Sequence, residues 1–392
     1  MSITIEGLSV RAKRLSYVAA PFAVLALSAC GDSECSPGEN DVRLVQAIVV
    51  PGNPLDAFDV SWADGNSQRL YLADRGNAGV EVIDTATGSF IRRIAGFAGD
   101  ADHDHSGPNG VVLVPERNEL WAGDGDSSVK VVNLSDDSVA SVSTGGNARA
   151  DELSYDPDDQ LVLVVNNAEA SDDGVNAHFA TLISTADGHE VVAKIPFPQA
   201  SAGLEQSIWD SASGRFYLAV PELDGDPSRG AVAVIDPHAA SVVATFAVSE
   251  CEPAGLALGP DNHLLLGCSG DAIEAGFAAK SVIMDLRDGS IVSEVAEIGG
   301  SDEVWFNPGD MSYYLAARDD PRGPALGVID AISNTFRSRT PTSVDAKSVA
   351  VDAVSNRVFV ALTPDPVGAT SPDASCPDGC IGVYTRDEAC GQ

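Results

Sequence analysis

Acidic and amide side chains recur where apolar segments of this chain begin. The residues concerned are Asp59, Asn109, Asp151 or Glu152, Glu205 with Gln206, Asp302 or Glu303, and, at the last such position, Lys347. Carboxylate and amide oxygens are the preferred ligands of Ca²⁺ and other hard cations. If the apolar segments converge, the pattern predicts a site for a divalent cation such as calcium. Its expected ligands are Asn109, Glu152, Glu205 and Glu303.

Two of the six histidines lie in one short segment, Asp100–Ser106. His103 and His105 are two positions apart, so an extended chain would point them to opposite sides, and one metal ion is not expected to bind both. We expect His103 to contact a ligand. We expect His105, Glu152 and Glu205 to transfer protons in a reaction. The alternative is a solvated loop whose polar side chains only cap the backbone.

Fixed positive charges accompany these acids. Arg75, Arg318 and Lys347 are expected to hold the carboxylate of a ligand. Glu222, in the segment Val220–Asp226, is expected to reach the same ligand from a neighbouring loop. Each cation can equally be the salt-bridge partner of a nearby acid.

A repeated pattern between Phe58 and Arg386 must position these side chains. The pattern occurs seven times, and each copy but the last has four short apolar strands in roughly 50 residues, with period-2 alternation, as in Arg69–Ala73 and Val80–Asp84. Such strands, separated by turns rich in Gly, Asp and Asn, predict an all-β, seven-bladed β-propeller around a central channel. The first strands of the copies centre on Trp62, Leu113, Tyr155, Trp209, Leu258, Phe306 and Val351.

The seventh copy is incomplete, because it ends after its third strand, Cys380–Tyr384. A lone apolar segment, Val42–Val50, precedes the first complete copy. We therefore expect the N-terminal strand to complete the last blade and close the ring. Acids that end third strands, such as Asp84, are expected to cap turns.

Long connections are expected between second and third strands. They are Asn166–Phe179, Pro221–Gly230, Ser269–Lys280 and Thr363–Gly379. In a propeller these loops lie on the face where the first strands begin, so this face is expected to bind the ligand.

The segments Leu70–Ala73 and Val80–Asp84 resemble YVTN-type and NHL-type propeller repeats, and the resemblance spans nearly the whole mature chain. Such repeats mark a fold and not an activity. The segment Gly107–Val111 is similar to gluconolactonase-type propellers, where acidic and Asn residues at blade starts hold a divalent metal. That resemblance implies a metal-dependent, lactonase-like hydrolase. Those enzymes usually have six blades, whereas this sequence contains seven copies.

Residues 1–29 are expected to be a signal peptide outside the propeller. Three basic residues precede an apolar run, Tyr17–Leu27, that is too short to span a membrane. The run leads into Leu27-Ser28-Ala29-Cys30, which resembles the lipobox of bacterial lipoproteins. An ordinary secretory signal with an incidental cysteine is the alternative.

The lipoprotein resemblance implies cleavage before Cys30 and lipidation of that residue. Residues 30–41 would then be a polar tether, and residues 42–392 the propeller. Gly31 follows the cysteine, and by similarity with Gram-negative lipoproteins this implies a location in the cell envelope, anchored to the outer membrane. The lipid chain would be the only contact with the membrane.

Six cysteines remain once Cys30 is set aside, an even number that fits an oxidising compartment. Their positions in the repeats make three pairs feasible: Cys251–Cys268, Cys376–Cys380 and Cys35–Cys390. The last pair would tie the two ends of the ring together. Metal binding by these thiols is the rival interpretation, but the sequence contains no Cys-x-x-Cys motif.

The chain is strongly acidic, with 58 acidic and 23 basic residues and a formal net charge of -35. This balance opposes binding to nucleic acid. It indicates either a solvated acidic exterior or a surface that collects cations. The sequence also lacks a P-loop and a Gly-x-Ser-x-Gly motif.

Two functions are therefore compatible with the sequence. The first is a binding protein that engages an envelope protein or a small-molecule ligand through its loop-rich face. The second is the metal-dependent hydrolase, in which a metal-bound water would attack a carbonyl group.

Overall fold

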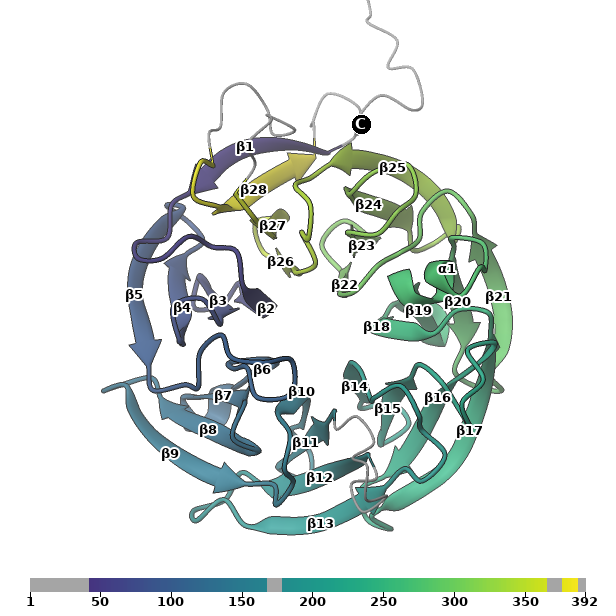
Figure 1. The fold of residues 1–392 in the computed structure, drawn as a ribbon, viewed down its shortest axis with the longest axis horizontal. Coiled ribbons are helices and arrows are strands. Elements are labelled where there is room, and N and C mark those ends of the chain that lie inside the picture. Colours follow the sequence, from purple (N-terminus) through teal and green to yellow (C-terminus); the bar gives the residue numbers. More distant parts are fainter. Residues whose placement is uncertain (1–41, 168–177, 365–375, 387–392) are drawn as a thin grey trace, which may run out of the picture. The chain divides into compact units, whose positions relative to one another are not determined.

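The computed structural model describes residues 42–167, 178–364 and 376–386, which all belong to one compact unit. These residues form seven antiparallel four-stranded sheets, arranged as the blades of a ring (Figure 1). The predicted seven-bladed β-propeller is therefore confirmed.

The first three blades follow the chain in order. Blade one contains β2 (Phe58–Asp64), β3 (Arg69–Asp74), β4 (Gly79–Asp84) and β5 (Ser89–Ala95). Blade two contains β6 (Val111–Val114), β7 (Glu119–Asp124), β8 (Ser128–Asn133) and β9 (Ser138–Ser143). Blade three contains β10 (Ala150–Asp156), β11 (Leu161–Asn166), β12 (Phe179–Ser184) and β13 (Val191–Pro196).

The next three blades have the same order. Blade four contains β14 (Ser207–Asp210), β15 (Arg215–Val220), β16 (Arg229–Asp236) and β17 (Ser241–Ser249). Blade five contains β18 (Pro253–Leu258), β19 (His263–Cys268), β20 (Ser281–Asp285) and β21 (Ser290–Val295). Blade six contains β22 (Val304–Asn307), β23 (Ser312–Ala317), β24 (Ala325–Asp330) and β25 (Thr335–Pro341).

Blade seven is made from both ends of the described chain. It contains β26 (Val349–Asp352), β27 (Arg357–Leu362), β28 (Cys380–Arg386) and, as its outer strand, β1 (Val42–Ile48). β1 pairs antiparallel with β28, from Val42 opposite Arg386 to Ile48 opposite Ile381. Figure 1 shows the two strands side by side where the ring closes. The expected closure by the N-terminal strand is thus confirmed.

Helical structure is scarce in the described residues. It consists of α1 (Gly270–Glu274) and two single 3-10 turns, Pro115–Arg117 and Pro260–Asn262. None of the described helices is long and apolar enough to cross a membrane.

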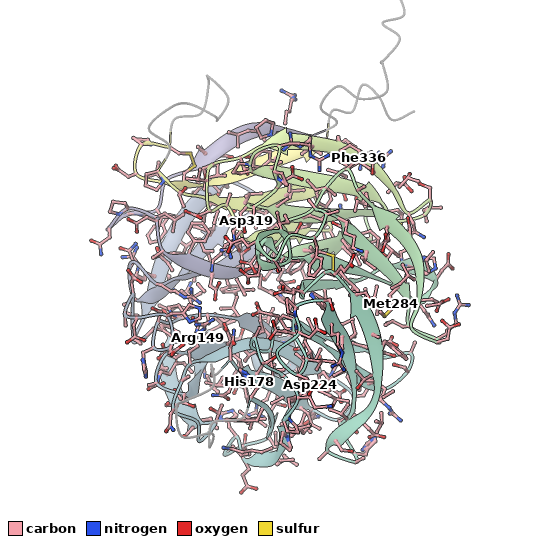
Figure 2. All side chains as sticks on the ribbon, turned by 45° about the vertical axis from the view of Figure 1, so that its right-hand side comes forward. Arg149, His178, Asp224, Met284, Asp319 and Phe336 are labelled. Atoms are coloured by element: carbon pink, nitrogen blue, oxygen red, sulfur yellow. A yellow bond between two sulfur atoms is a disulfide. The ribbon has the colours of Figure 1, made fainter. Side chains whose placement is uncertain are left out.

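The hydrophobic core is divided among the seven interfaces between neighbouring blades. Val, Leu and Ile side chains of alternating strand positions fill each interface, as period-2 patterning requires. Met284, for example, packs between blades four and five, and Figure 2 shows side chains filling the space between the ribbons. Each blade therefore depends on both neighbours for burial.

The predicted turn caps and two of the predicted disulfides are present in the structure. The Asp84 carboxylate accepts a hydrogen bond from the backbone N–H of Thr87 (2.8 Å), and acids at equivalent positions cap their own turns. Disulfides join Cys251 to Cys268 and Cys376 to Cys380. The expected Cys35–Cys390 pair and the lipidated Cys30 lie outside the described residues.

Candidate functional site

A polar cavity of about 290 Å³ lies where the first strands begin, and we call it the basin. Most residues of the predicted acidic ring line it: Asp59, Asp151, Glu152, Glu205, Asp302, Glu303 and Lys347. They lie in the first strands of blades one and three and in the connections into blades four, six and seven, so no single blade contains the site. Loops between second and third strands also contribute, as expected, and so do the connections between blades.

β-bulges aim several of these acids into the channel. The pairing of β10 with β11 loses register between Ala150 and Leu153, and the bulge contains Asp151 and Glu152. An equivalent shift in β2, between Phe58 and Ser61, contains Asp59. A bulge re-aims side chains that the regular pleat would place on the other face.

Close backbone approach from blade two holds the bulge of β10 in place. The Gly110 N–H donates a hydrogen bond to the Asp151 carbonyl (3.2 Å). A Cβ atom on Gly123 would lie only 2.4 Å from that carbonyl oxygen, so a side chain cannot be accommodated there without a backbone shift. The two glycines therefore position the adjacent acids.

Two cations balance the negative charge of the Asp59 carboxylate. Arg75 forms an ion pair with one carboxylate oxygen, and Lys347 Nζ lies 2.7 Å from the other. Burial opposes the ionisation of Asp59, but the two cations outweigh it and hold its pKa far below the usual range. Arg75 also donates hydrogen bonds to the Asn109 side-chain oxygen, with distances of 2.6 Å and 2.9 Å. Asn109 is fully buried and does not line the basin.

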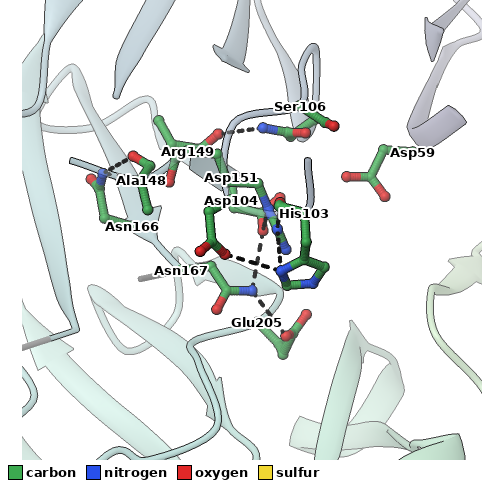
Figure 3. A network of polar contacts seen from close by, with 12 residues as sticks. Asp59, His103, Asp104, Ser106, Ala148, Arg149, Asp151, Asn166, Asn167 and Glu205 are labelled. Atoms are coloured by element: carbon green, nitrogen blue, oxygen red, sulfur yellow. Dashed lines mark hydrogen bonds and ion pairs between the residues drawn. The ribbon is translucent and has the colours of Figure 1, made fainter. Parts of the chain in front are cut away.

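A second charged network crosses blades three and four (Figure 3). Arg149 Nε donates to the Asp151 carboxylate (2.8 Å), and its guanidinium also contacts the backbone carbonyl of His103. Asn167 Nδ2 lies 3.2 Å from Asp151 and 3.3 Å from Glu205, which places one amide between two carboxyl groups.

Arg318 forms the third cationic centre. Its guanidinium lies 3.2 Å from the Asp302 carboxylate and 3.1 Å from that of Asp319. All three sequence-predicted cations, Arg75, Arg318 and Lys347, therefore line the basin and are already paired with aspartates.

None of the basin glutamates, Glu152, Glu205 and Glu303, forms an ion pair with an Arg or Lys of the described residues. Burial, together with the neighbouring carboxylates Glu303, Asp151, Asp59 and Glu205, raises the pKa of Glu152 well above its usual range. Burial likewise raises the pKa of Glu303 far above normal, and Asp59 adds to the effect. Burial and the Asp151 charge raise the pKa of Glu205 to about 8. Burial therefore disfavours the ionised form of all three carboxyl groups when no cation is bound.

Glu152 differs from the other two in its contacts. Glu303 accepts a hydrogen bond from the Ser348 hydroxyl (3.0 Å), and Glu205 faces Asn167. Glu152 is only 9% exposed, and it makes no hydrogen bond or ion pair with another described residue. Its carboxyl group nevertheless lines the cavity, where it can meet a ligand.

The remaining sequence-predicted residues lie at or beyond the rim. His103 lines the basin, and its Nδ1 lies 3.1 Å from Asp104. His105 does not line the basin. Its exposed ring contacts Asp102 (2.7 Å), and this hydrogen bond raises the His105 pKa. Glu222 also lies off the basin, where it accepts a hydrogen bond from Ser201 (2.7 Å).

The basin does not contain a preformed metal site among the residues described. No group of three or more His, Cys, Asp or Glu side chains is close enough there to hold a metal ion. The side-chain oxygen of Asn109 is also taken by Arg75. The divalent cation stays a prediction.

Sequence reasoning did not single out six polar residues of the basin: Arg149, Asn167, Ser269, Asp271, Ser301 and Asp319. Arg149 was detectable, because it directly precedes a first strand, as the predicted acids do. Asp319 follows Arg318 in a loop after the second strand. Asn167 and Asp271 lie in two of the long loops expected on this face, but nothing in the sequence distinguished them from the other loop residues.

Comparison with known proteins shows the fold alone. No protein-family model matches the sequence, and no curated protein matches it. A similar solved structure is the hydrazine synthase of Kuenenia stuttgartiensis, with 12% sequence identity and a TM-score of 0.64. The similarity covers 87% of this chain and 99% of that one. Fold and site together define a seven-bladed β-propeller with a charged basin at one mouth of its channel.

Proposed function

We propose that this protein binds a small organic cation, a molecule with one or more ammonium groups, in the basin. The observation that carries the proposal is Glu152, a buried carboxyl group that lines the cavity without a partner among the described residues. An ammonium group would give it a charge-assisted hydrogen bond and offset the cost of burying its charge.

The charge balance of the whole basin supports the same ligand class. Eight carboxyl groups line it: Asp59, Asp151, Glu152, Glu205, Asp271, Asp302, Glu303 and Asp319. Four permanently charged cations line it: Arg75, Arg149, Arg318 and Lys347. The four cations pair with four aspartates, which leaves the three glutamates and Asp271 to accept charge from a ligand. A free carboxylate ligand would find every basin cation already paired.

Isothermal titration calorimetry with two probes of matched length tests the proposal. Putrescine, a diammonium, is expected to bind, whereas succinate, a dicarboxylate, is not. Glu152→Gln removes the charge that the ammonium group needs and is expected to weaken putrescine binding by about tenfold to a hundredfold. Glu294→Gln, the same substitution on the outer surface of blade five, is the control and should leave binding unchanged.

Two outcomes would overturn the proposal. One is tighter binding of succinate than of putrescine, and the other is putrescine binding that Glu152→Gln does not weaken. Metal analysis of the purified protein tests the hydrolase alternative in the same preparation. A stoichiometric divalent ion that is lost on Glu303→Gln would favour that alternative.

We further infer that the protein is anchored in the cell envelope through lipidated Cys30, so that the basin would face an envelope ligand. The apolar run and lipobox-like segment before Cys30 support this inference. Wild-type protein is expected to partition into a detergent phase, whereas Cys30→Ser should remain in the aqueous phase. Equal partitioning of the two proteins would contradict the anchor.

A further inference from the structure

The central channel contains a second cavity, of about 580 Å³, which we call the apolar cavity. It is lined by aromatic and aliphatic side chains of the first strands, among them Trp62, Tyr155, Trp209, Leu258 and Trp305. Trp62 and Trp305 meet edge to face, with ring centroids 5.3 Å apart, although they come from blades one and six. The cavity is therefore built across the channel axis.

The first strands connect the two cavities and change polarity along their length. β2 passes from Asp59 in the basin to Trp62 in the apolar cavity. β10 passes in the same way from Asp151 to Tyr155, and β22 from the preceding Glu303 to Phe306. Several blades thus present charge at one mouth and apolar surface further along the channel.

Glu152 is the residue that lines both cavities. Several other polar groups of the apolar cavity are already engaged with the protein, although the buried indole N–H of Trp209 has no hydrogen-bond partner. The Ser154 and Ser207 hydroxyls bond to each other (2.7 Å), and the Gln206 side-chain oxygen accepts from the Leu256 N–H (2.6 Å). The unpartnered carboxyl group therefore lies between a charged basin and an apolar space.

We propose that the two cavities form one site for an amphipathic amine, with its ammonium group at Glu152 and its hydrocarbon body in the apolar cavity. This inference rests on the proposed function, and it specifies the ligand class. Charge complementarity places the head group, and burial against Trp62, Trp209 and Leu258 would stabilise the body.

Primary alkylamines of increasing length test the continuity of the site on the unmodified protein. Ethylamine, butylamine and hexylamine place the same ammonium group on growing hydrocarbon chains. Each added methylene is expected to strengthen binding by about fourfold, or about fifteenfold for each pair, because it leaves water for the apolar cavity. A constant affinity along the series would overturn the inference.

Hexanol and hexanoate separate the contribution of the head group from that of the tail. Hexanol is expected to bind about tenfold or more weakly than hexylamine, and hexanoate more weakly still, because neither supplies a positive charge to Glu152. Hexanol binding as tight as that of hexylamine would mean that the apolar cavity acts alone, and this would overturn the single site.

Two variants test where the hydrocarbon chain of the amine binds. Leu258 lines the apolar cavity and is partly exposed, so Leu258→Asn is expected to reduce the gain per methylene and to leave ethylamine binding unchanged. Val243→Asn is the matched control, because Val243 lies on the outer strand β17 and is 51% exposed. It should change neither the gain in affinity per methylene nor the affinity for ethylamine. Three of the four tryptophans line this cavity, so hexylamine should also alter the tryptophan emission more than ethylamine does.

The series distinguishes the two levels of the proposal. If the short diammonium probe putrescine binds in a Glu152-dependent manner while chain length has no effect, the basin proposal stands and the continuous site is wrong. If no amine binds at all, both are wrong.

Discussion

At the scale of single residues, four aspartates of the basin differ from its glutamates in their ion pairs. Asp59, Asp151, Asp302 and Asp319 each lie within ion-pair distance of Arg or Lys. Glu152, Glu205 and Glu303 do not. These four aspartates therefore build the site, and the glutamates, together with the unpaired Asp271, are the groups available to a ligand.

The raised pKa of Glu152 makes amine binding depend on pH. The ammonium group requires the ionised carboxylate, so binding must release a proton when the carboxyl group starts protonated. The titratable groups that act on Glu152 are Glu303, Asp151, Asp59 and Glu205.

Putrescine affinity should consequently rise between about pH 5 and pH 9, since alkylammonium groups stay charged until about pH 10. Titration in two buffers of different ionisation enthalpy measures the released protons. Glu152→Gln should reduce the release, whereas proton uptake on binding would contradict the prediction.

At the scale of elements, β1 completes a blade to which it is not adjacent in sequence. Val42 and Ile48 at its two ends are buried, and its pairing with β28 runs along the whole strand. The sequence predicted this closure because the seventh repeat lacked one strand. It could not reveal the bulges of β2 and β10, because a bulge depends on the register of the neighbouring strand and not on local pattern.

Removing part of the buried face of β1 tests its contribution to stability. Ile48→Ala is expected to lower the free energy of unfolding by about 2–5 kcal/mol, because Ile48 is 3% exposed and packs between blades seven and one. Val49→Ala, at a residue 63% exposed, should cost less than about 0.5 kcal/mol. Urea unfolding measures both, and equal losses would show that β1 is not held by its core contacts.

The Cys251–Cys268 disulfide closes a loop between residues 17 positions apart, which links the start of β18 to the end of β19. Replacing both cysteines with alanine is expected to cost about 3 kcal/mol in the free energy of unfolding, because the unfolded chain regains that loop's freedom. The Cys376–Cys380 pair spans only four positions and serves as the comparison. A larger loss on removing the shorter loop would contradict this explanation.

At the scale of the whole molecule, burial raises the pKa of several carboxyl groups in the folded state. Burial raises the pKa of Glu81 to about 8, although Arg93 opposes the shift. Burial also raises the pKa of Glu252 to about 7. The pKa values of Glu205, Glu152 and Glu303 in the basin are raised as well. The unfolded chain would release these protons near the ordinary glutamate pKa of 4.5.

Because the folded state binds more protons, the free energy of unfolding should fall as pH rises from about 5 to 9. Urea unfolding at a series of pH values measures the slope. Glu81→Gln removes one of the titrating groups and should make the slope shallower. Stability that rises across this range would show that these carboxyl groups are not buried in protonated form.

The sequence by itself determined the fold, because period-2 strands and turn residues are local signals that recur in every blade. It also located most of the ring of charged residues, since blade starts can be counted along the chain. Only the tertiary structure decided how those charges are used. Pairing depends on distances between blades that are remote in sequence, and these distances joined Lys347 to Asp59 and left Glu152 without a partner. The same inter-blade geometry placed an apolar cavity beyond that residue.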